Sequence, residues 1–249
     1  MNMRFGLKLW STNHDLLNRA KEVIENNTFQ YIELMYIPNT EITHFLGIIV
    51  PYVIHIPTSL RGMNIADKDK KKTNLKIIEK CIEWADKLNA KYLILHPGFG
   101  NISDAKLFLE EIDDKRILLE NMPKVGINDE KMVGYSPNQI KELIGKKFGL
   151  CLDLNHAIKA SVSLKVDYKL LIEEFLKLNP KMFHISDGKL DNEKDAHLNI
   201  GEGEYDFEFL IKCIKRNELK YVTLETPRKN INSLEEDMHN FKKLRVFIE

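Results

Sequence analysis

Short apolar runs alternate with amphipathic segments along most of the chain. Each run is too short for a helix and nearly continuous in hydrophobic residues, as is typical of strands buried on both faces of a parallel sheet. The predicted strands are FGLKLW (5–10), YIELMYI (31–37), YVIHI (52–56), YLILH (92–96), ILLEN (117–121), FGLCLDL (148–154), MFHIS (182–186) and YVTLE (221–225). Between them hydrophobic residues recur at helical spacing, as at Ile78, Cys81, Ile82 and Ala85.

This alternation predicts the fold class. Eight short strands that alternate with helices favour an α/β fold of the (β/α)8 TIM-barrel type, and an open, doubly wound sheet is the alternative. Because no linker or long repeat interrupts the pattern, we expect one domain over residues 1–249. The longest irregular stretch, 186–205, is polar and contains glycine, which indicates a functional loop.

Two helix starts carry capping signals. Ser136 precedes Pro137 at a first helical position and has Gln139 three residues later. Ser233 has Glu236 at the same offset. We therefore expect helices to begin directly after both serines.

Composition narrows the class of protein. Lys and Arg together number 37, as do Asp and Glu, so the chain as a whole has no attraction to nucleic acid, and any such surface must be a local basic patch. The three cysteines, Cys81, Cys151 and Cys213, form no Cys-x-x-Cys pair and are expected to be reduced core residues. The sequence contains neither a signal-peptide pattern nor a run approaching the ~20 apolar residues that span a bilayer. These features predict a cytoplasmic protein without a membrane partner.

Ionisable residues gather where the predicted strands end, and five of the eight histidines are among them. The set is His55, His96, Glu120, Asp153, His156, His184, Asp195, His197 and Glu225. In a barrel these positions converge on one mouth. A single such residue is explained by hydrogen bonds in the core, but several carboxylates in one place repel each other unless cations lie between them. Imidazole and carboxylate ligands without thiolate fit zinc, with manganese or iron as alternatives.

Two local motifs strengthen this interpretation. Asp153-Leu-Asn-His156 leaves a strand and turns, so both side chains can face the barrel mouth. Asp195-Ala-His197 places two ligands on one side of an extended segment, because alternate residues share a face. The Gly201-Glu-Gly203 segment that follows allows close backbone approach, although it is also compatible with a simple turn.

Several segments resemble the endonuclease IV branch of the xylose-isomerase-like barrels, the type 2 AP endonucleases. They are HPG at 96–98, LEN at 119–121, LDLNHA at 152–157, HISDGK at 184–189, DAHLNIGEG at 195–203 and LETP at 224–227. They cover the C-terminal two-thirds of the chain, with His55 as an upstream match. The resemblance implies a zinc-dependent hydrolase that cleaves DNA at abasic sites in DNA repair.

The resemblance also implies how the ligands divide among up to three zinc ions. His55, His96 and Glu120 would hold the first ion. Glu120 would bridge to a second ion, which the remaining strand-end ligands would complete: Asp153, His184 and Glu225. The third ion would be held by His156, Asp195 and His197. Sugar isomerases and epimerases of the superfamily usually lack this Asp-x-His pair.

The predicted loops depart from the endonuclease pattern. The first strand ends in Lys8-Leu-Trp-Ser11 where the family usually has His and Ser. Thr58 stands near the position of a DNA-penetrating Tyr, and 36–39 lacks the expected Arg. Glu33 is more familiar from sugar isomerases. The ligand set therefore resembles a nuclease, whereas the substrate-reading loops do not.

Three functions remain open. In a phosphodiesterase the metals would do most of the chemistry, with Glu120 and Glu225 as catalytic residues. Basic residues near the mouth would contact phosphates: Lys8, Arg61, Lys124, Lys189 and Arg228. In a sugar isomerase or epimerase one metal would suffice, Glu120 and Glu225 would exchange a proton with carbon, and His156 would contact the small sugar. A non-catalytic binding or scaffold barrel is the third possibility.

Overall fold

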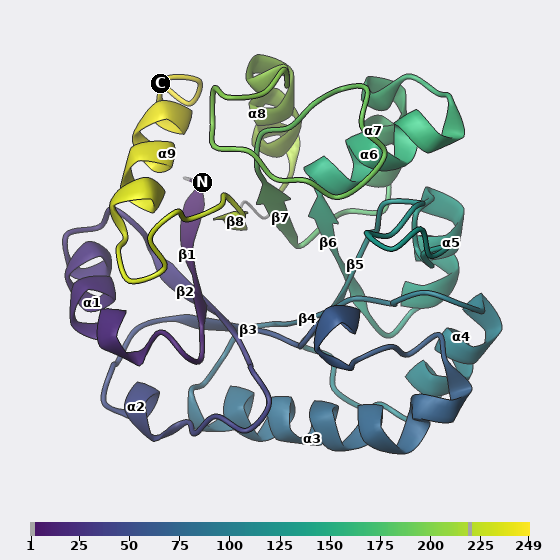
Figure 1. Ribbon diagram of the computed structural model, residues 1–249, viewed down its shortest axis with the longest axis horizontal. Helices are drawn as coiled ribbons and strands as arrows, with labels where there is room; N and C mark the ends of the chain where they lie inside the picture. Colours follow the sequence, from purple (N-terminus) through teal and green to yellow (C-terminus); the bar gives the residue numbers. More distant parts are fainter. Residues whose placement is uncertain (1–2, 219–220) are drawn as a thin grey trace.

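Eight parallel strands close into a barrel in the computed structural model, which describes residues 3–218 and 221–249 (Figure 1). Each strand pairs with its sequence neighbours, and β8 pairs with β1. The strands are β1 (Arg4–Trp10), β2 (Tyr31–Met35), β3 (Tyr52–His55), β4 (Leu93–Leu95), β5 (Ile117–Glu120), β6 (Gly149–Asp153), β7 (Met182–Ile185) and β8 (Tyr221–Leu224). The pairing of β1 with β8 confirms the predicted (β/α)8 barrel and excludes the open sheet.

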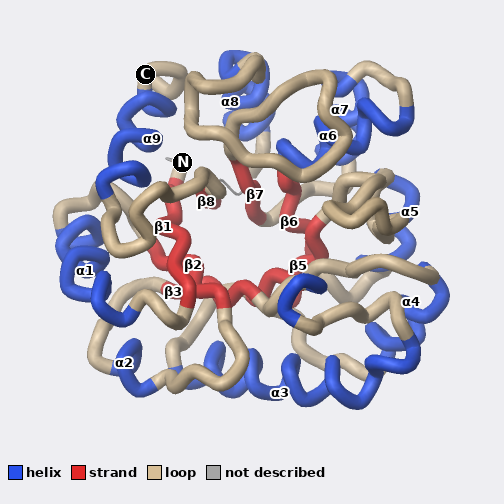
Figure 2. Tube along the Cα trace, viewed as in Figure 1, coloured by secondary structure: helices blue, strands red, loops and turns tan. Residues whose placement is uncertain are grey.

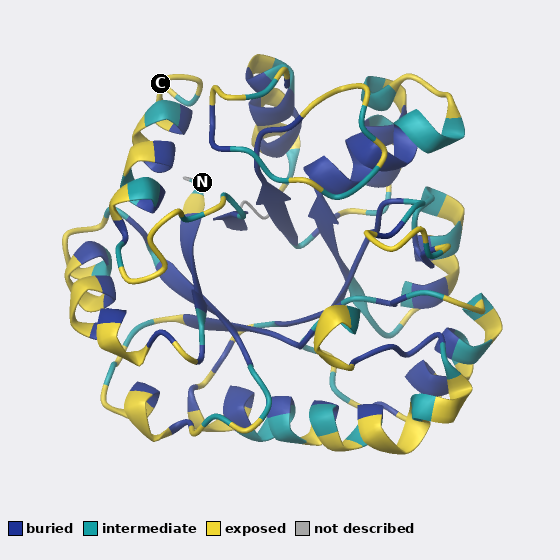
Figure 3. Ribbon diagram, in the orientation of Figure 1, coloured by how far each residue is buried: buried dark blue, intermediate teal, exposed yellow. Residues whose placement is uncertain are grey.

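Helices form a ring outside the strands, as Figure 2 shows. They are α1 (Leu17–Glu25), α2 (Thr43–Leu46), α3 (Lys71–Lys87), α4 (Ile102–Glu110), α5 (Pro137–Ile144), α6 (Leu154–Leu164), α7 (Tyr168–Leu176), α8 (Phe207–Arg216) and α9 (Glu235–Arg245). Their buried faces turn toward the strands and their exposed faces toward solvent (Figure 3). In α3, for example, Ile78, Cys81 and Ala85 are buried at the predicted spacing. Burial of these apolar stripes is what holds the helices on the barrel.

The first predicted helix start is confirmed and the second is displaced. The Ser136 side chain accepts a hydrogen bond from the Gln139 amide, and α5 begins at Pro137. Near Ser233, however, the helix begins only at Glu235. The Glu236 carboxylate accepts from the Lys229 amide in the preceding loop, so it is not available to cap the backbone at Ser233.

The barrel interior is built in layers. Alternate residues of a strand point inward, so side chains two positions apart stack along the barrel axis. One layer is apolar and is filled by Tyr31, Val53, Ile94, Leu118, Cys151, Met182 and Tyr221. Two residues further along the same strands the next inward positions are mostly ionisable. The layer of ionisable side chains therefore lies directly next to the apolar layer, which we call the apolar plug.

Three other predictions concern the whole chain. Cys81, Cys151 and Cys213 are buried and free, as expected. The predicted functional loop, 186–205, contains neither helix nor strand. Among the described residues no helix is both long and apolar enough to cross a membrane.

Candidate metal centre

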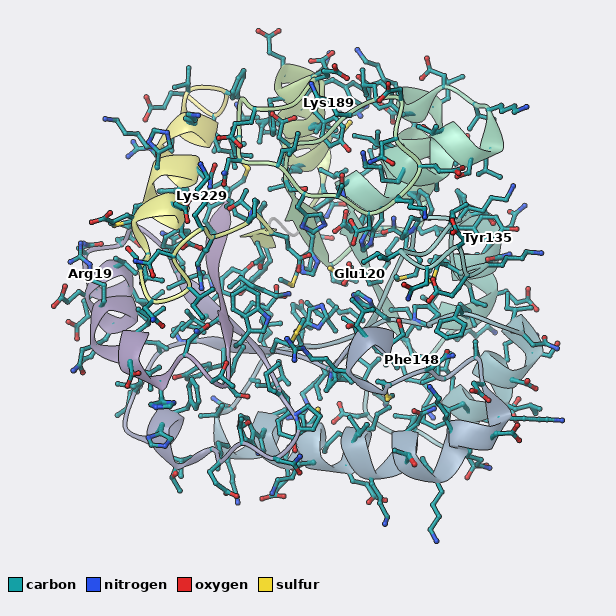
Figure 4. All side chains as sticks on the ribbon, in the orientation of Figure 1. Arg19, Glu120, Tyr135, Phe148, Lys189 and Lys229 are labelled. Carbon is teal, nitrogen blue, oxygen red and sulfur yellow. The ribbon has the colours of Figure 1, made fainter. Side chains whose placement is uncertain are left out.

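Ionisable side chains occupy the inward layer above the apolar plug. Its members on the strands are Lys8, Glu33, His55, Glu120, Asp153 and His184, and all are buried. His96 and Glu225 follow directly after β4 and β8. Figure 4 shows Glu120 inside the ring of strands. Strand pairing thus brings together residues that lie far apart in the sequence.

The first predicted ligand group is assembled at the ends of β3, β4 and β5. Glu120 Oε2 lies 3.6 Å from His55 Nε2 and 3.1 Å from His96 Nε2. One ligand atom from each of the three residues lies within 4.8 Å of the others. This spacing is suitable for a shared cation.

The second group surrounds His184. Its Nδ1 atom lies 3.3 Å from Glu120 Oε2 and 3.2 Å from Glu225 Oε1. Asp153 Oδ2 lies 3.9 Å from the same nitrogen. Glu120 belongs to both groups, so its carboxylate is placed where it could bridge two ions.

The third group joins α6 to the 186–205 loop. His156 Nε2 lies 3.2 Å from Asp195 Oδ2, and His197 Nε2 lies 2.8 Å from Asp195 Oδ1. Asp153 caps α6 by accepting from the His156 amide at 2.7 Å, and this capping bond places His156 beside the strand ends. The structure therefore brings the nine predicted ligand residues together at the barrel mouth. In the third group the ligand atoms that all lie within 4.8 Å of one another belong to Asp153, His156 and His197, and Asp195 joins them through its contacts with the two imidazoles.

The outward ring nitrogens of four histidines are hydrogen-bonded to oxygen atoms that can only accept. The Nδ1 partners are Ile56 O for His55 (2.8 Å), Asn121 O for His156 (2.8 Å) and Glu225 O for His197 (2.6 Å). His184 Nε2 lies 3.0 Å from Glu33 Oε2. Each outward nitrogen must therefore carry a proton, so in the neutral ring the inward nitrogen presents a lone pair. This tautomer is the one a metal ligand requires.

The carboxylate oxygens and ring nitrogens that point into the centre lack the hydrogen bonds that buried polar groups normally make. Within the described part of the chain no hydrogen-bond partner faces either oxygen of Glu120, His184 Nδ1 or His96 Nε2. Carboxylate oxygens and imidazole lone pairs that face each other in a buried site repel unless a cation lies between them. Divalent metal satisfies these atoms together, so the donor set fits such an ion.

Electrostatic neighbours shift the imidazole pKa values in opposite directions. Burial and the Lys8 ammonium lower the pKa of His55, which keeps this ring neutral at pH 7. Burial also lowers the pKa of His184, but the carboxylates of Glu225, Glu33 and Glu120 outweigh it and raise the pKa well above its ordinary value. The negative field that attracts a proton to His184 would equally attract a divalent cation, and the two compete for one lone pair.

Glu33 and Lys8 form a buried ion pair within the centre. They were not among the predicted ligands, because only ionisable residues at the ends of the predicted strands were selected. Lys8 and Glu33 are register neighbours on β1 and β2. The Lys8 ammonium donates to Glu33 Oε1 and to Glu225 Oε1, the latter at 2.5 Å. Burial alone would lower the pKa of Lys8, but Glu225 and Glu33 raise it above its ordinary value. The sequence did contain a signal for this pair, because Lys8 and Glu33 are charged residues inside otherwise apolar runs.

Cys151 is a further neighbour that the sequence placed only in the core. It lies within the same 4.8 Å limit of Glu120 and His184. Burial raises the pKa of its thiol to about 12. Cys151 is thus a further side chain of the apolar layer that reaches two of the predicted ligands.

The predicted phosphate-binding residues have different surroundings. Lys8 is buried, and Arg228 is buried with a bidentate pair to Asp237 at 2.6 and 2.8 Å. Lys189 is on the outer loop (Figure 4) and pairs with Glu204 at 3.1 Å, whereas Arg61 is exposed. Substrate binding by these side chains stays a prediction, and Arg61 and Lys189 are the two that solvent reaches readily.

A small cavity adjoins the first and third ligand groups. It has a volume of about 80 Å³, and His96 and Asp195 form part of its wall. Thr58, which stands near the position where the endonuclease resemblance implies a Tyr, also lines the cavity. Met122 and Met132 supply part of its apolar lining. The cavity thus joins polar ligand residues to an apolar wall.

The loop that carries Asp195 and His197 is held by buried polar contacts. The Asp187 carboxylate accepts hydrogen bonds from the backbone amides of Gly201 (2.8 Å) and Gly203 (2.9 Å). A Cβ on Gly203 would lie 2.2 Å from Asp187 Oδ1, so the predicted close backbone approach is present here. These residues shape the loop without touching the ligand atoms.

Comparison with known proteins gives a family and a fold. Residues 29–244 match the model of the family described as xylose isomerase-like TIM barrel. A probable endonuclease 4 of Mycoplasmopsis synoviae is 29% identical over 198 residues, which cover 70% of this chain and 69% of the relative.

Solved structures of two kinds share the fold. A D-tagatose 3-epimerase-like protein superposes with a TM-score of 0.77 and 21% identity, covering 99% of this chain and 97% of the other. Endonuclease IV from Thermus thermophilus gives 0.73 and 18% identity, with 98% of each chain covered. At these identities the likeness shows the barrel alone.

Proposed function

The chain belongs to the xylose isomerase-like TIM barrel family, and from this premise we propose that it is a divalent-metal phosphodiester hydrolase that cleaves DNA at abasic sites. The observation that carries the proposal is the third ligand group, His156, Asp195 and His197, beside the other two. An isomerase would need one metal, so it would not require this group as a further set of metal ligands. The similarity to a probable endonuclease 4 supports the same conclusion.

The position of each ligand residue indicates its role in the proposed hydrolysis. Divalent ions, zinc foremost and manganese or iron as alternatives, supply Lewis-acid activation of water and of a phosphoryl oxygen. Glu120 links the first two groups through one buried carboxylate. Glu225 contributes Oε1 to the second group, while its backbone carbonyl accepts from His197 in the third. These two glutamates are thus our candidates for the catalytic residues.

Substrate would reach the centre through the cavity beside His96 and Asp195. Arg61, on the loop after β3, is exposed near the cavity-lining residues Thr58, Ser59 and Leu60. An exposed guanidinium can contact a phosphate without losing an internal partner. We propose Arg61, with Lys189, as the phosphate-binding side chains.

Sugar isomerisation or epimerisation is the second candidate, and Glu33 favours it. Glu33 is a buried carboxylate that holds His184 by its Nε2 atom. Glu120 and Glu225 both approach the opposite nitrogen of this ring, at 3.3 and 3.2 Å. A single ion at this group with two flanking carboxylates would suffice for proton exchange with a ketose. The likeness to a D-tagatose 3-epimerase-like protein is in the fold only.

The third ligand group separates the two candidates. We expect zinc-replete protein to carry more than one ion per chain by elemental analysis. Changing Asp195 and His197 together to Ala should remove one ion and slow incision of a duplex with one abasic site by at least about 100-fold. The assay needs low salt because a chain without net charge holds DNA weakly.

Asp191→Ala is the matched control, since Asp191 is an exposed carboxylate on the same loop. It should keep both the ion count and the incision rate. At most one ion in the wild-type protein, together with turnover of any ketose in a panel, would reject the hydrolase and favour the isomerase.

A further inference from the structure

Lys8 places a positive charge inside the candidate metal centre. Its ammonium donates to Glu33 and, at 2.5 Å, to Glu225 Oε1, and its side chain is only 7% exposed. Lysine is cationic at neutral pH, and two carboxylates beside it favour that state. This part of the centre thus has a counter-charge that belongs to the protein itself.

The carboxylates that hold Lys8 also belong to a donor set of metal-site dimensions. Glu33, His55, His184 and Glu225 each offer one ligand atom within 4.8 Å of the others. Glu225 is in addition a member of the second ligand group, with Glu120, Asp153 and His184. An ion in that group would therefore share Glu225 with the Lys8 ammonium.

We propose that Lys8 is a built-in counter-cation: it takes the place of a metal ion between Glu33 and Glu225, and it weakens the binding of divalent metal by the neighbouring second group. The inference rests on the proposed metal centre. Its physical basis is that the ammonium satisfies Glu225 without metal and repels a cation placed beside it. Lys8 therefore stabilises the metal-free protein and limits how tightly metal is held.

Two substitutions should shift metal affinity in opposite directions. Lys8→Met keeps an unbranched side chain, one atom shorter, but removes its charge, which leaves Glu33 and Glu225 without a counter-ion until metal binds. Zinc should then be held about 10–100-fold more tightly, a change of the same size as the losses that follow when groups around metal ligands are altered. Glu33→Gln keeps an acceptor but removes a negative charge, so zinc should be held about 10-fold more weakly. In the double variant the two changes should largely cancel.

A purely structural Lys8 predicts a different pattern. If the ammonium only held Glu225 in place, Lys8→Met and Glu33→Gln would both loosen the ligands and both lose zinc. The sign of the Lys8→Met effect therefore separates the two roles. Lys91→Met is the matched control, because Lys91 is an exposed cation that precedes β4 at the opposite end of the barrel and bonds Tyr221 there.

The experiment measures the zinc dissociation constant by chelator competition, and Tm with and without zinc, for the full chain and each variant. Tighter zinc in Lys8→Met, weaker zinc in Glu33→Gln and no change in Lys91→Met support the inference. Weaker or unaltered zinc in Lys8→Met overturns it. If Lys8→Met does not fold without metal, it is prepared with zinc, and unaltered or tighter zinc in Glu33→Gln overturns the inference instead.

Different results would contradict the proposed function and the proposed role of Lys8. If the wild-type protein binds no divalent metal, both the proposed function and the role of Lys8 fall. If it binds metal and the two variants do not shift the dissociation constant in opposite directions, only the role of Lys8 falls.

Discussion

Glu120 is the residue on which most of the centre depends. Both of its oxygens are buried and lack hydrogen-bond partners among the described residues, while imidazoles approach from several strands. Burial alone would raise its pKa, but His96 and His184 hold the pKa well below its ordinary value. The carboxylate is therefore charged, and its charge must be balanced by protonated imidazoles or by metal.

Replacing Glu120 by Gln tests this dependence. The amide keeps the size of the side chain but removes the charge shared by the first two ligand groups. We expect zinc affinity to fall at least about 100-fold at these groups and activity to be lost under either proposed chemistry. Zinc titration and the incision assay measure both effects, with wild-type protein as the reference. Turnover like that of the wild type would show that Glu120 neither binds metal nor acts in catalysis.

At the scale of elements, the loop between β7 and α8 decides whether the third ligand group exists. A residue of helix α6 orients this loop, because Asn155 Nδ2 donates to Asp195 Oδ1 at 2.8 Å. The Tyr205 hydroxyl donates in turn to Asn155 Oδ1 at 2.6 Å. Asn155 therefore acts as a positioning residue that fixes the Asp195 carboxylate between two imidazoles.

Asn155→Leu keeps the branching of the side chain but removes its hydrogen bonds to Asp195 and Tyr205, so it should loosen Asp195. We expect the third ion to be bound about 10–100-fold more weakly, while the ions held by the first two groups remain. Tyr205→Phe leaves the Asn155 donor in place and should have a smaller effect. Elemental analysis at a series of free zinc concentrations counts the ions in each variant. Equal retention of the third ion by Asn155→Leu and the wild type would contradict the positioning role.

On the scale of the whole molecule, the apolar plug of the barrel lies against a layer of ionisable side chains in which several carboxylates stand close together. Packing of the plug and of the outer helices stabilises the fold, whereas the carboxylates above the plug oppose it unless cations are present. Lys8 balances part of this charge. Metal binding should therefore stabilise the folded chain as a whole.

Removal of metal should lower the melting temperature. A ligand at a hundredfold excess over its Kd stabilises the native state by about 2.7 kcal/mol. For a chain of this size that corresponds to about 5–10 °C in Tm. Calorimetry with zinc and with chelator measures the difference, and the Asp195/His197 double alanine variant should show a smaller one. An unchanged Tm after chelation would argue against a metal centre of this kind.

Much of the architecture could be predicted because it depends on local patterns. The eight apolar runs became the eight strands, and several strands, such as β5 at Glu120, end in an ionisable residue that lies at the barrel mouth. The displaced start of α9 was not predictable, since Glu236 bonds an amide in the loop rather than its own helix. Such a choice between partners depends on the three-dimensional path of the loop.

The sequence by itself determined where the strands and helices lie along the chain, which helix faces are apolar and which residues are candidate ligands, because periodicity and residue chemistry are local properties. Only the tertiary structure decided the partners of each charge. Lys8 and Arg228 are basic residues in the sequence, yet closure of the barrel places one between Glu33 and Glu225 and the other against Asp237. Register between neighbouring strands and the pairing of β1 with β8 create these contacts, and no pattern along a single chain segment encodes them.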